Sequence, residues 1–353
     1  MRVEKLECLN FRNISFENIL PCESMNVICG ENAQGKTNFL EAIWLFTGAK
    51  SFRGSKDSEF VKFGSEKTVI SMNFISEEIE KEASIEIKEK RIATLNGNKL
   101  KSAHSLAGNF NAIIFSPTDL KIVSEGPSHR RKFLDTAIGQ LYPSYIEILK
   151  NYVRAVTQRN KIIKDLKFDS TVSIMLDVFE EEIAQNGEKI INMRKKYVEK
   201  LNEHLEKIYE GISSGKEFLD MDYLASANKD LREKLLFSRR EDSLSGVTSV
   251  GPHRDDVEFK INGFSARSFA SQGQKRSVAL SLKLAEAEVI NKNVGECPCF
   301  LLDDVMSELD PERQNFILNH IEGMQAFITC CDPSNIKNLK KGKIFNVKEG
   351  RVV

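Results

Sequence analysis

Eight consecutive residues near the start of the chain have the types and spacing of a loop that binds a polyphosphate. They are Gly30, Glu31, Asn32, Ala33, Gln34, Gly35, Lys36 and Thr37. Glycines at both ends let backbone N–H groups approach phosphate oxygens where a Cβ would clash. In such a loop the lysine contacts the β- and γ-phosphates, and the threonine hydroxyl is a ligand of Mg²⁺. The pattern therefore predicts a nucleotide site at residues 30–37.

A pair of carboxylates far along the chain is the candidate partner of this loop. The apolar run Phe300–Leu302 is followed directly by Asp303 and Asp304. Mg²⁺ on a triphosphate needs an acidic partner at the C-terminal end of a strand, and Asp303 fits that role. A carboxylate at the next position can orient or deprotonate the attacking water, so Asp304 joins Lys36 as a candidate catalytic residue. Apolar runs that end in two aspartates are common, and the loop upstream gives this one its interpretation.

The segment Ser271-Gln272-Gly273-Gln274 has the composition of a helix start. Ser271 is placed as an N-cap, with Gly273 and Gln274 in the first turn. The apolar residues that follow keep helical spacing, at Val278, Leu282, Ala285 and Val289. A helix N-terminus with a small hydroxyl and a glycine is suited to meet a phosphate. The alternative is an ordinary capped helix with no ligand.

Regular elements on both sides of the phosphate-binding loop are predicted to hold it in place. Val27–Cys29 has the composition of the end of a buried strand. After Lys36, apolar residues recur at helical spacing, at Phe39, Leu40, Ile43, Trp44 and Phe46. This strand–loop–helix order directs the N-terminus of the helix at the phosphate.

Length and composition describe a globular protein of more than one lobe. The chain has 353 residues, which is more than one hydrophobic core usually serves. Its residues are 41% hydrophobic and 29% charged, as in globular proteins. No apolar run approaches a membrane span, and the charged N-terminal segment does not resemble a signal peptide. The seven cysteines have neither disulfide-framework nor C-x-x-C spacing, so we expect reduced thiols in a cytoplasmic protein. A net charge of zero does not exclude a local basic surface.

These motifs, in this order and with Ser307–Asp310 after the second strand, resemble the set of the ABC-type ATPases. The chain is similar in particular to the RecF family, bacterial recombination mediators in the SMC-like branch. That closer resemblance rests on three stretches, Asn10–Asn13, Phe115–Leu120 and Gly251–Asp256. The combination of GPHRDD with ASQGQKR is specific, and the resemblance extends over nearly the whole chain.

The resemblance implies an α/β fold, a P-loop ABC-type ATPase head with a mixed sheet and an inserted helical arm. Residues 1–129 and 251–353 would form the head, and residues 130–250 the arm. Two Asn-Gly pairs, Asn96-Gly97 and Asn262-Gly263, lie between alternating apolar residues and predict hairpins. Between Arg130 and Tyr209 the pattern is helical, with one interruption at Pro143 and a loop near residues 168–171.

The resemblance also implies a function: ATP-dependent DNA binding in recombinational repair, replication-fork maintenance and the SOS response. ATP with Mg²⁺ would join two copies into a homodimer, the Ser271 segment of one copy capping the γ-phosphate bound by the other. Arg12 and Asn13 are placed near the nucleotide by the same resemblance. RecR and RecO are the implied protein partners, and the implied DNA is double-stranded or a single/double-strand junction. Asp304 stands where many ABC-type ATPases have glutamate, so slow hydrolysis is expected. The histidine that those ATPases often have after the segment matching Ser307–Asp310 is not evident here, and Thr329 is the nearest polar candidate.

Basic residues in two places are the candidate DNA contacts. Lys50, Arg53 and Lys56 follow the first helix, and Arg130 and Arg131 open the arm. Backbone phosphates require lysine or arginine in a stripe without a base-edge code. For any one of these residues, a solvated helix face is the alternative.

Two other classes of protein share part of this pattern. A transporter's nucleotide-binding subunit has the three nucleotide motifs, but it would lack the helical arm and GPHRDD and would need a membrane partner. A P-loop kinase of a small metabolite would share the loop alone.

Overall fold

Alternation of buried and exposed side chains decides how the first strands assemble. The computed structural model describes residues 1–164, 172–227, 230–332 and 342–353. In the fourth strand every second side chain is buried, as one-sided packing of a sheet requires. Six strands form an antiparallel sheet near the N-terminus of the chain, in the order β2-β1-β4-β5-β6-β7. Their bounds are Arg2–Phe11, Ile14–Ile19, Thr68–Ser76, Ile79–Ile87, Arg91–Leu95 and Asn98–Lys99 for β1, β2, β4, β5, β6 and β7.

A second six-stranded sheet has the order β15-β14-β3-β13-β12-β8 and is parallel except at β15. Its strands β8, β12 and β13 are buried at every position, which is typical of a parallel sheet covered on both faces. The six strands are β3 Met25–Cys29, β8 Ala112–Phe115, β12 Cys299–Leu302, β13 Ala326–Cys330, β14 Gly342–Lys348 and β15 Arg351–Val352. The mixed α/β class expected from the sequence is confirmed.

Alternate residues of the parallel sheet face two different cores. Ile28 and Phe327 pack with the helix α1 (Lys36–Leu45) and with the antiparallel sheet. Val27, Phe300 and Ile328 face the opposite core, which contains α8 (Gln272–Val294) and the helices of the arm. The parallel sheet therefore carries the phosphate-binding loop between two packed layers.

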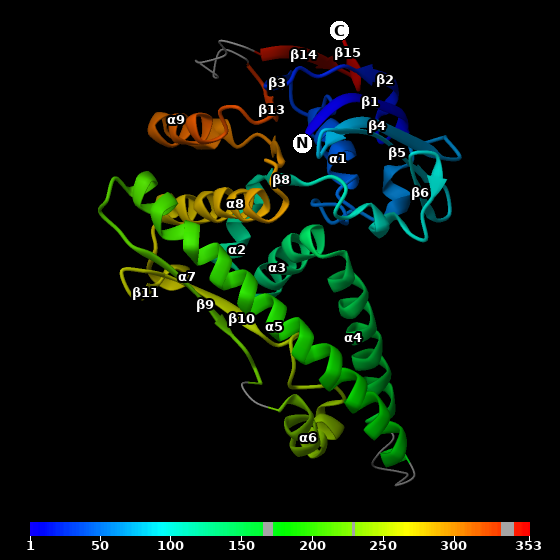
Figure 1. The fold of residues 1–353 in the computed structure, drawn as a ribbon, viewed down its shortest axis with the longest axis vertical. Coiled ribbons are helices and arrows are strands. Elements are labelled where there is room, and N and C mark those ends of the chain that lie inside the picture. The colour runs from blue at the N-terminus through cyan, green and yellow to red at the C-terminus, as the bar shows by residue number, and fades with distance from the viewer. Residues whose placement is uncertain (165–171, 228–229, 333–341) are drawn as a thin grey trace.

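The remaining helices lie on the α8 side of that sheet and extend away from it (Figure 1). They are α2 Leu120–Ser124, α3 Pro127–Leu141, α4 Pro143–Ile162, α5 Val172–Ser213, α6 Leu231–Ser245, α7 Ala266–Phe269 and α9 Pro311–His320. Helices α4 and α5 pack side by side, and α6 packs on α5. Pro143 begins α4 as predicted, while the loop near residues 168–171 lies outside the described residues. Among the described helices, none combines the length and apolarity that a membrane span needs.

Both predicted Asn-Gly hairpins are present. β6 pairs with β7 around Asn96-Gly97, and β10 (Asp256–Ile261) pairs with β11 (Phe264–Ser265) around Asn262-Gly263. β10 also pairs with β9 (Leu219–Leu224) in a three-stranded sheet. This sheet joins residues on both sides of position 250, and the domain boundaries given above stay a prediction.

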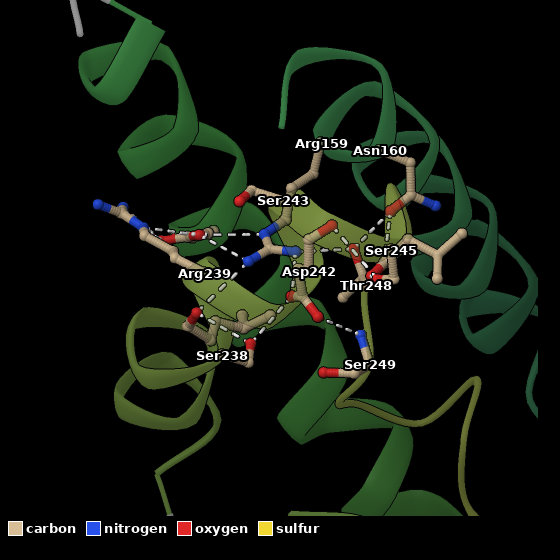
Figure 2. A network of polar contacts seen from close by, with 12 residues as sticks. Arg159, Asn160, Ser238, Arg239, Asp242, Ser243, Ser245, Thr248 and Ser249 are labelled. Carbon is tan, nitrogen blue, oxygen red and sulfur yellow. Dashed lines mark hydrogen bonds and ion pairs between the residues drawn. The ribbon is translucent and has the colours of Figure 1, made fainter. Parts of the chain in front are cut away.

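A buried polar network fixes α6 to the paired helices α4 and α5 (Figure 2). Arg159 of α4 is fully buried and donates to Glu180 of α5 at 3.0 Å. It also donates to Asp242 of α6 at 2.7 Å and to Thr248 at 2.9 Å. A second arginine, Arg239 of α6, also donates to the carboxylate of Glu180. One guanidinium therefore joins three helices.

Arg159→Met is expected to destabilise the protein by roughly 3–5 kcal/mol, because it leaves the buried carboxylates of Glu180 and Asp242 without their shared cation. Arg154→Met on the same helix is the matched control. Its exposed pair with Glu182 is worth at most about 1 kcal/mol. Urea unfolding followed by circular dichroism measures both, and equal shifts of the two midpoints would contradict the role given to Arg159.

Candidate nucleotide site

The phosphate-binding loop runs from the end of β3 to the start of α1, as the sequence predicts. Gly30 and Gly35 have φ of 157° and 104°, in a region that L side chains rarely adopt. A Cβ on Gly30 would collide with the carbonyl oxygen of Val347, and a Cβ on Gly35 would lie 2.5 Å from the side chain of Asn13. Both glycines are therefore required by the backbone and by its neighbours.

Residues that follow β14 hold the loop from the other side. Glu349 and Gly350 donate their backbone N–H groups to Gln34, to Oε1 at 2.6 Å and to the carbonyl oxygen at 2.8 Å. Gly350 is as constrained as Gly30, since a Cβ there would lie 2.7 Å from the carbonyl oxygen of Asn13. The loop is thus held by a segment more than 300 positions away in sequence.

Lys36 is the first residue of α1 and is almost entirely buried. Its Nζ donates to the carbonyl oxygens of Gly30 at 2.7 Å and Glu31 at 3.2 Å, and lies 3.4 Å from Sγ of Cys331. The ammonium group therefore lies over the loop itself. A cation in this place can attract the terminal phosphates of a nucleotide.

Thr37 in the first turn of α1 and Asp303 directly after β12 are in contact. The Thr37 hydroxyl donates to Oδ1 of Asp303 at 2.7 Å, and Thr329 donates to the same oxygen at 3.0 Å. Burial raises the pKa of Asp303, and the hydrogen bonds from the two threonines oppose that shift. A hydroxyl and a carboxylate oxygen are the hard ligands that Mg²⁺ takes alongside phosphate oxygens. This donor set fits the ion.

Asp304 has a left-handed backbone, with φ of 52°. Its N–H donates to the hydroxyl of Thr329 at 2.8 Å, and its carbonyl oxygen accepts from Ser307 at 2.9 Å. Non-glycine residues in this region cost about 1–3 kcal/mol and cluster at functional sites. Thr329, the nearest polar candidate for the place of the missing histidine, thus contacts both aspartates.

Arg12 and Asn13 differ in their distance from the loop. Asn13 donates to the carbonyl oxygen of Gln34 at 3.1 Å and accepts from Asn38 at 2.8 Å. Arg12 instead pairs with Glu41 of α1 at 2.6 Å. Glu41 is fully buried, and sequence reasoning missed it. A carboxylate in the middle of an apolar helix was the signal that could have found it.

The first turn of α8 is capped as predicted. Ser271 accepts from the N–H of Gln274 at 3.2 Å, and its own N–H donates to Oε1 of Gln274 at 2.8 Å. Gln274 also donates to Glu217 at 2.7 Å. Within the described part of the chain, no hydrogen bond or ion pair joins residues 271–274 to residues 30–37. Within one chain, the capped start of α8 and the phosphate-binding loop therefore share no direct polar contact among the described residues.

One candidate DNA contact is corrected by the structure. Arg130 is 3% exposed and forms a two-point pair with Asp256, at 2.6 and 3.0 Å. It also donates to the carbonyl oxygens of Ile122 and Glu125. With its donors used inside the fold, Arg130 is not available to a phosphate on the surface.

The other candidates stay at or near the surface. Lys50, Arg53 and Lys56 are exposed, and Arg131 is half-buried. Lys50, Arg53 and Arg131 line one cavity although they come from distant parts of the sequence. Arg53 donates to Asn38 at 3.0 Å, next to the phosphate-binding loop.

The fold and the site define a P-loop ATPase head of the ABC type. The family model described as the RecF/RecN/SMC N-terminal domain matches residues 2–351. The DNA replication and repair protein RecF of Lachnospira eligens is 39% identical, over 100% of this chain and 99% of that protein. Its counterpart in Clostridium acetobutylicum is 40% identical over the same shares. The chain belongs to the RecF family, in the SMC-like branch of these ATPases.

Solved structures agree with this membership. The recombination mediator protein RecF with ATP, in the RecFOR pathway, has a TM-score of 0.92 at 39% identity, covering 100% of this chain and 97% of that one. The SMC head domain of Pyrococcus furiosus has a TM-score of 0.57 at 16% identity and shares the fold alone. These relatives do not favour the transporter subunit or the small-metabolite kinase.

Proposed function

We propose that the chain is an ATP-dependent DNA-binding protein of recombinational repair and replication-fork maintenance. The observation that carries the proposal is that, among the described residues, no hydrogen bond or ion pair joins the phosphate-binding loop to the capped start of α8 in the same chain. In this proposal the α8 of a second copy contacts the γ-phosphate bound by the first. ATP then joins two copies on DNA, and hydrolysis releases them.

In this proposal each part of the site has one role. The backbone of residues 30–37 and the Lys36 ammonium bind the phosphates, and Thr37 and Asp303 hold Mg²⁺. Asp304 orients the attacking water. Its side chain is one methylene shorter than glutamate, so we expect a weak ATPase that acts as a switch. Ser271 and Gly273, with Gln272 and Gln274 beside them, cap the phosphate of the partner copy.

The proposed DNA surface consists of Lys50, Arg53, Lys56 and Arg131. Lysine and arginine side chains neutralise backbone phosphates without reading sequence. The RecFOR pathway named for the solved relative supports RecR and RecO as protein partners. We place the protein in the cytoplasm, where its DNA is.

Lys50→Glu with Lys56→Glu tests the DNA surface. Affinity for any duplex should fall, and the slope of log affinity against log salt should decrease by about 2, because each phosphate contact contributes roughly 0.9. Fluorescence anisotropy with ATP present measures both quantities. Lys90→Glu with Lys101→Glu, exposed positions on the antiparallel sheet and its margin, is the control. DNA binding that does not depend on salt, or none at all, would contradict the proposal.

A further inference from the structure

A cavity of about 600 Å³ lies apart from the phosphate-binding loop. Its walls come from the end of α1 and the loop after it, from β8 and α2, and from α3, the start of α4 and α8. None of residues 30–37 lines it. This volume is in the range of cavities that enclose a small organic ligand.

The exposed rim of the cavity is cationic. Lys50, Arg53 and Lys132 are exposed lining residues, and the half-buried Arg131 lies beside them. Within the described residues, no ion pair occupies the side chain of Lys50 or of Lys132. These two lysines come from segments about 80 positions apart in sequence, yet they border one opening. The rim is therefore suited to an anionic group such as a phosphate.

The interior is largely apolar, and its charges are compensated. Trp44, Ile114 and Phe133 are buried among its lining residues. The one buried lysine, Lys283, pairs with Glu286 at 3.2 Å and lies over the ring of Phe133 at 4.9 Å. The interior thus offers apolar and aromatic surface without a net positive charge.

One buried polar group in the lining has no partner. Gln140 is 1% exposed, and its Oε1 accepts from the N–H of Ala112 at 3.1 Å. Its Nε2 has no hydrogen-bond partner among the described residues. An unpaired buried donor is costly, and an acceptor atom on a ligand in the cavity could pair with it.

We propose that this cavity receives one base of an unpaired DNA strand, while the adjacent phosphates lie on the rim cations. A nucleotide has the matching chemistry, with a flat, largely apolar base that carries acceptor atoms and an anion attached to it. The inference rests on the proposed DNA binding and adds a base-binding site to it. Lys283 and Glu286 belong to α8, so a base in the cavity would touch the helix whose start is proposed to contact the partner's ATP.

Two single strands of equal length and charge test the inference. One has a normal base at every position, and the other has abasic sites in its central half. Stacking contributes about 1–3 kcal/mol per base, so the normal strand should bind roughly 10-fold more tightly. Fluorescence anisotropy at one salt concentration, with ATP present, measures the ratio.

Thr136→Phe fills the cavity from α3 and should bring that ratio close to one. Thr157→Phe, an exposed position on α4 outside the lining, is the matched control and should keep the ratio. Circular dichroism and ATP affinity should be the same in both variants, which separates loss of the cavity from loss of the fold.

Four results would overturn the inference. If the strands bind equally to the unmodified protein, or if Thr136→Phe keeps the preference, the cavity takes no base, while the proposed DNA binding stands. If free dAMP binds, Thr136→Phe abolishes that binding and strand affinity is unchanged, the site belongs to free nucleotides. If neither strand nor duplex binds, the proposed function fails together with the inference.

Discussion

Lys36→Met is expected to weaken ATP binding about 10- to 100-fold and to abolish hydrolysis. Methionine matches lysine as far as the ε position but lacks the ammonium group, and a charge-assisted contact to phosphate is worth roughly 1.5–3 kcal/mol. The same substitution removes the hydrogen bonds to the carbonyl oxygens of Gly30 and Glu31. Titration calorimetry with ATP and Mg²⁺ measures the affinity, and phosphate release measures turnover.

Lys90→Met is the matched control for Lys36→Met, since Lys90 is exposed between β5 and β6. It should bind ATP as the unmodified protein does. Circular dichroism should give the same helix content for both variants. If Lys36→Met bound and hydrolysed ATP normally, the assignment of residues 30–37 would be wrong.

Ser271→Arg is expected to prevent nucleotide-dependent dimerisation and hydrolysis while ATP binding stays nearly normal. The phosphate-binding loop is intact in this variant, but bulk and charge replace the hydroxyl that is proposed to cap the partner's phosphate. The lost N-cap costs only about 1 kcal/mol of stability, which a helix as buried as α8 tolerates. Light scattering with and without a slowly hydrolysed ATP analogue measures the oligomeric state.

Two further variants sharpen this test. Ser245→Arg places the same side chain at an exposed position at the end of α6 and should still dimerise. Asp303→Asn should lose Mg²⁺-dependent hydrolysis with a smaller effect on dimerisation. An unmodified protein that stays monomeric with the analogue would refute capping by the partner, as would a Ser271→Arg variant that dimerises.

Local patterns in the sequence predicted the parts of the site that depend on neighbouring residues. The strand–loop–helix around Gly30–Thr37 and the capped start of α8 were predicted correctly, because periodicity and capping residues determine such elements. Thr37 of the loop and Asp303 after the second strand were each predicted as ligands of one Mg²⁺, and the structure brings their side chains into contact. Membership of the RecF family was predicted from several such motifs, and the family model and the similar proteins confirm it.

Features that depend on long-range packing could not be predicted in this way. Arg130 looked like part of a basic cluster, but its partner Asp256 lies 126 positions away and holds it inside the fold. The cavity formed by α1, α3 and α8 has no sequence signature, since it depends on how these helices are set against the sheet. The clamp on Gln34 is similar, because its partners Glu349 and Gly350 bind through their backbone N–H groups.

That clamp has a consequence for the synthesis of the protein. Strand β3 needs β13 and β14 as neighbours, and Gln34 needs the turn after β14. During synthesis the phosphate-binding loop is made well before residues 326–350. These neighbours exist only once residues 326–350 have been made, so we expect an unfinished chain to bind nucleotide more weakly than the whole chain does.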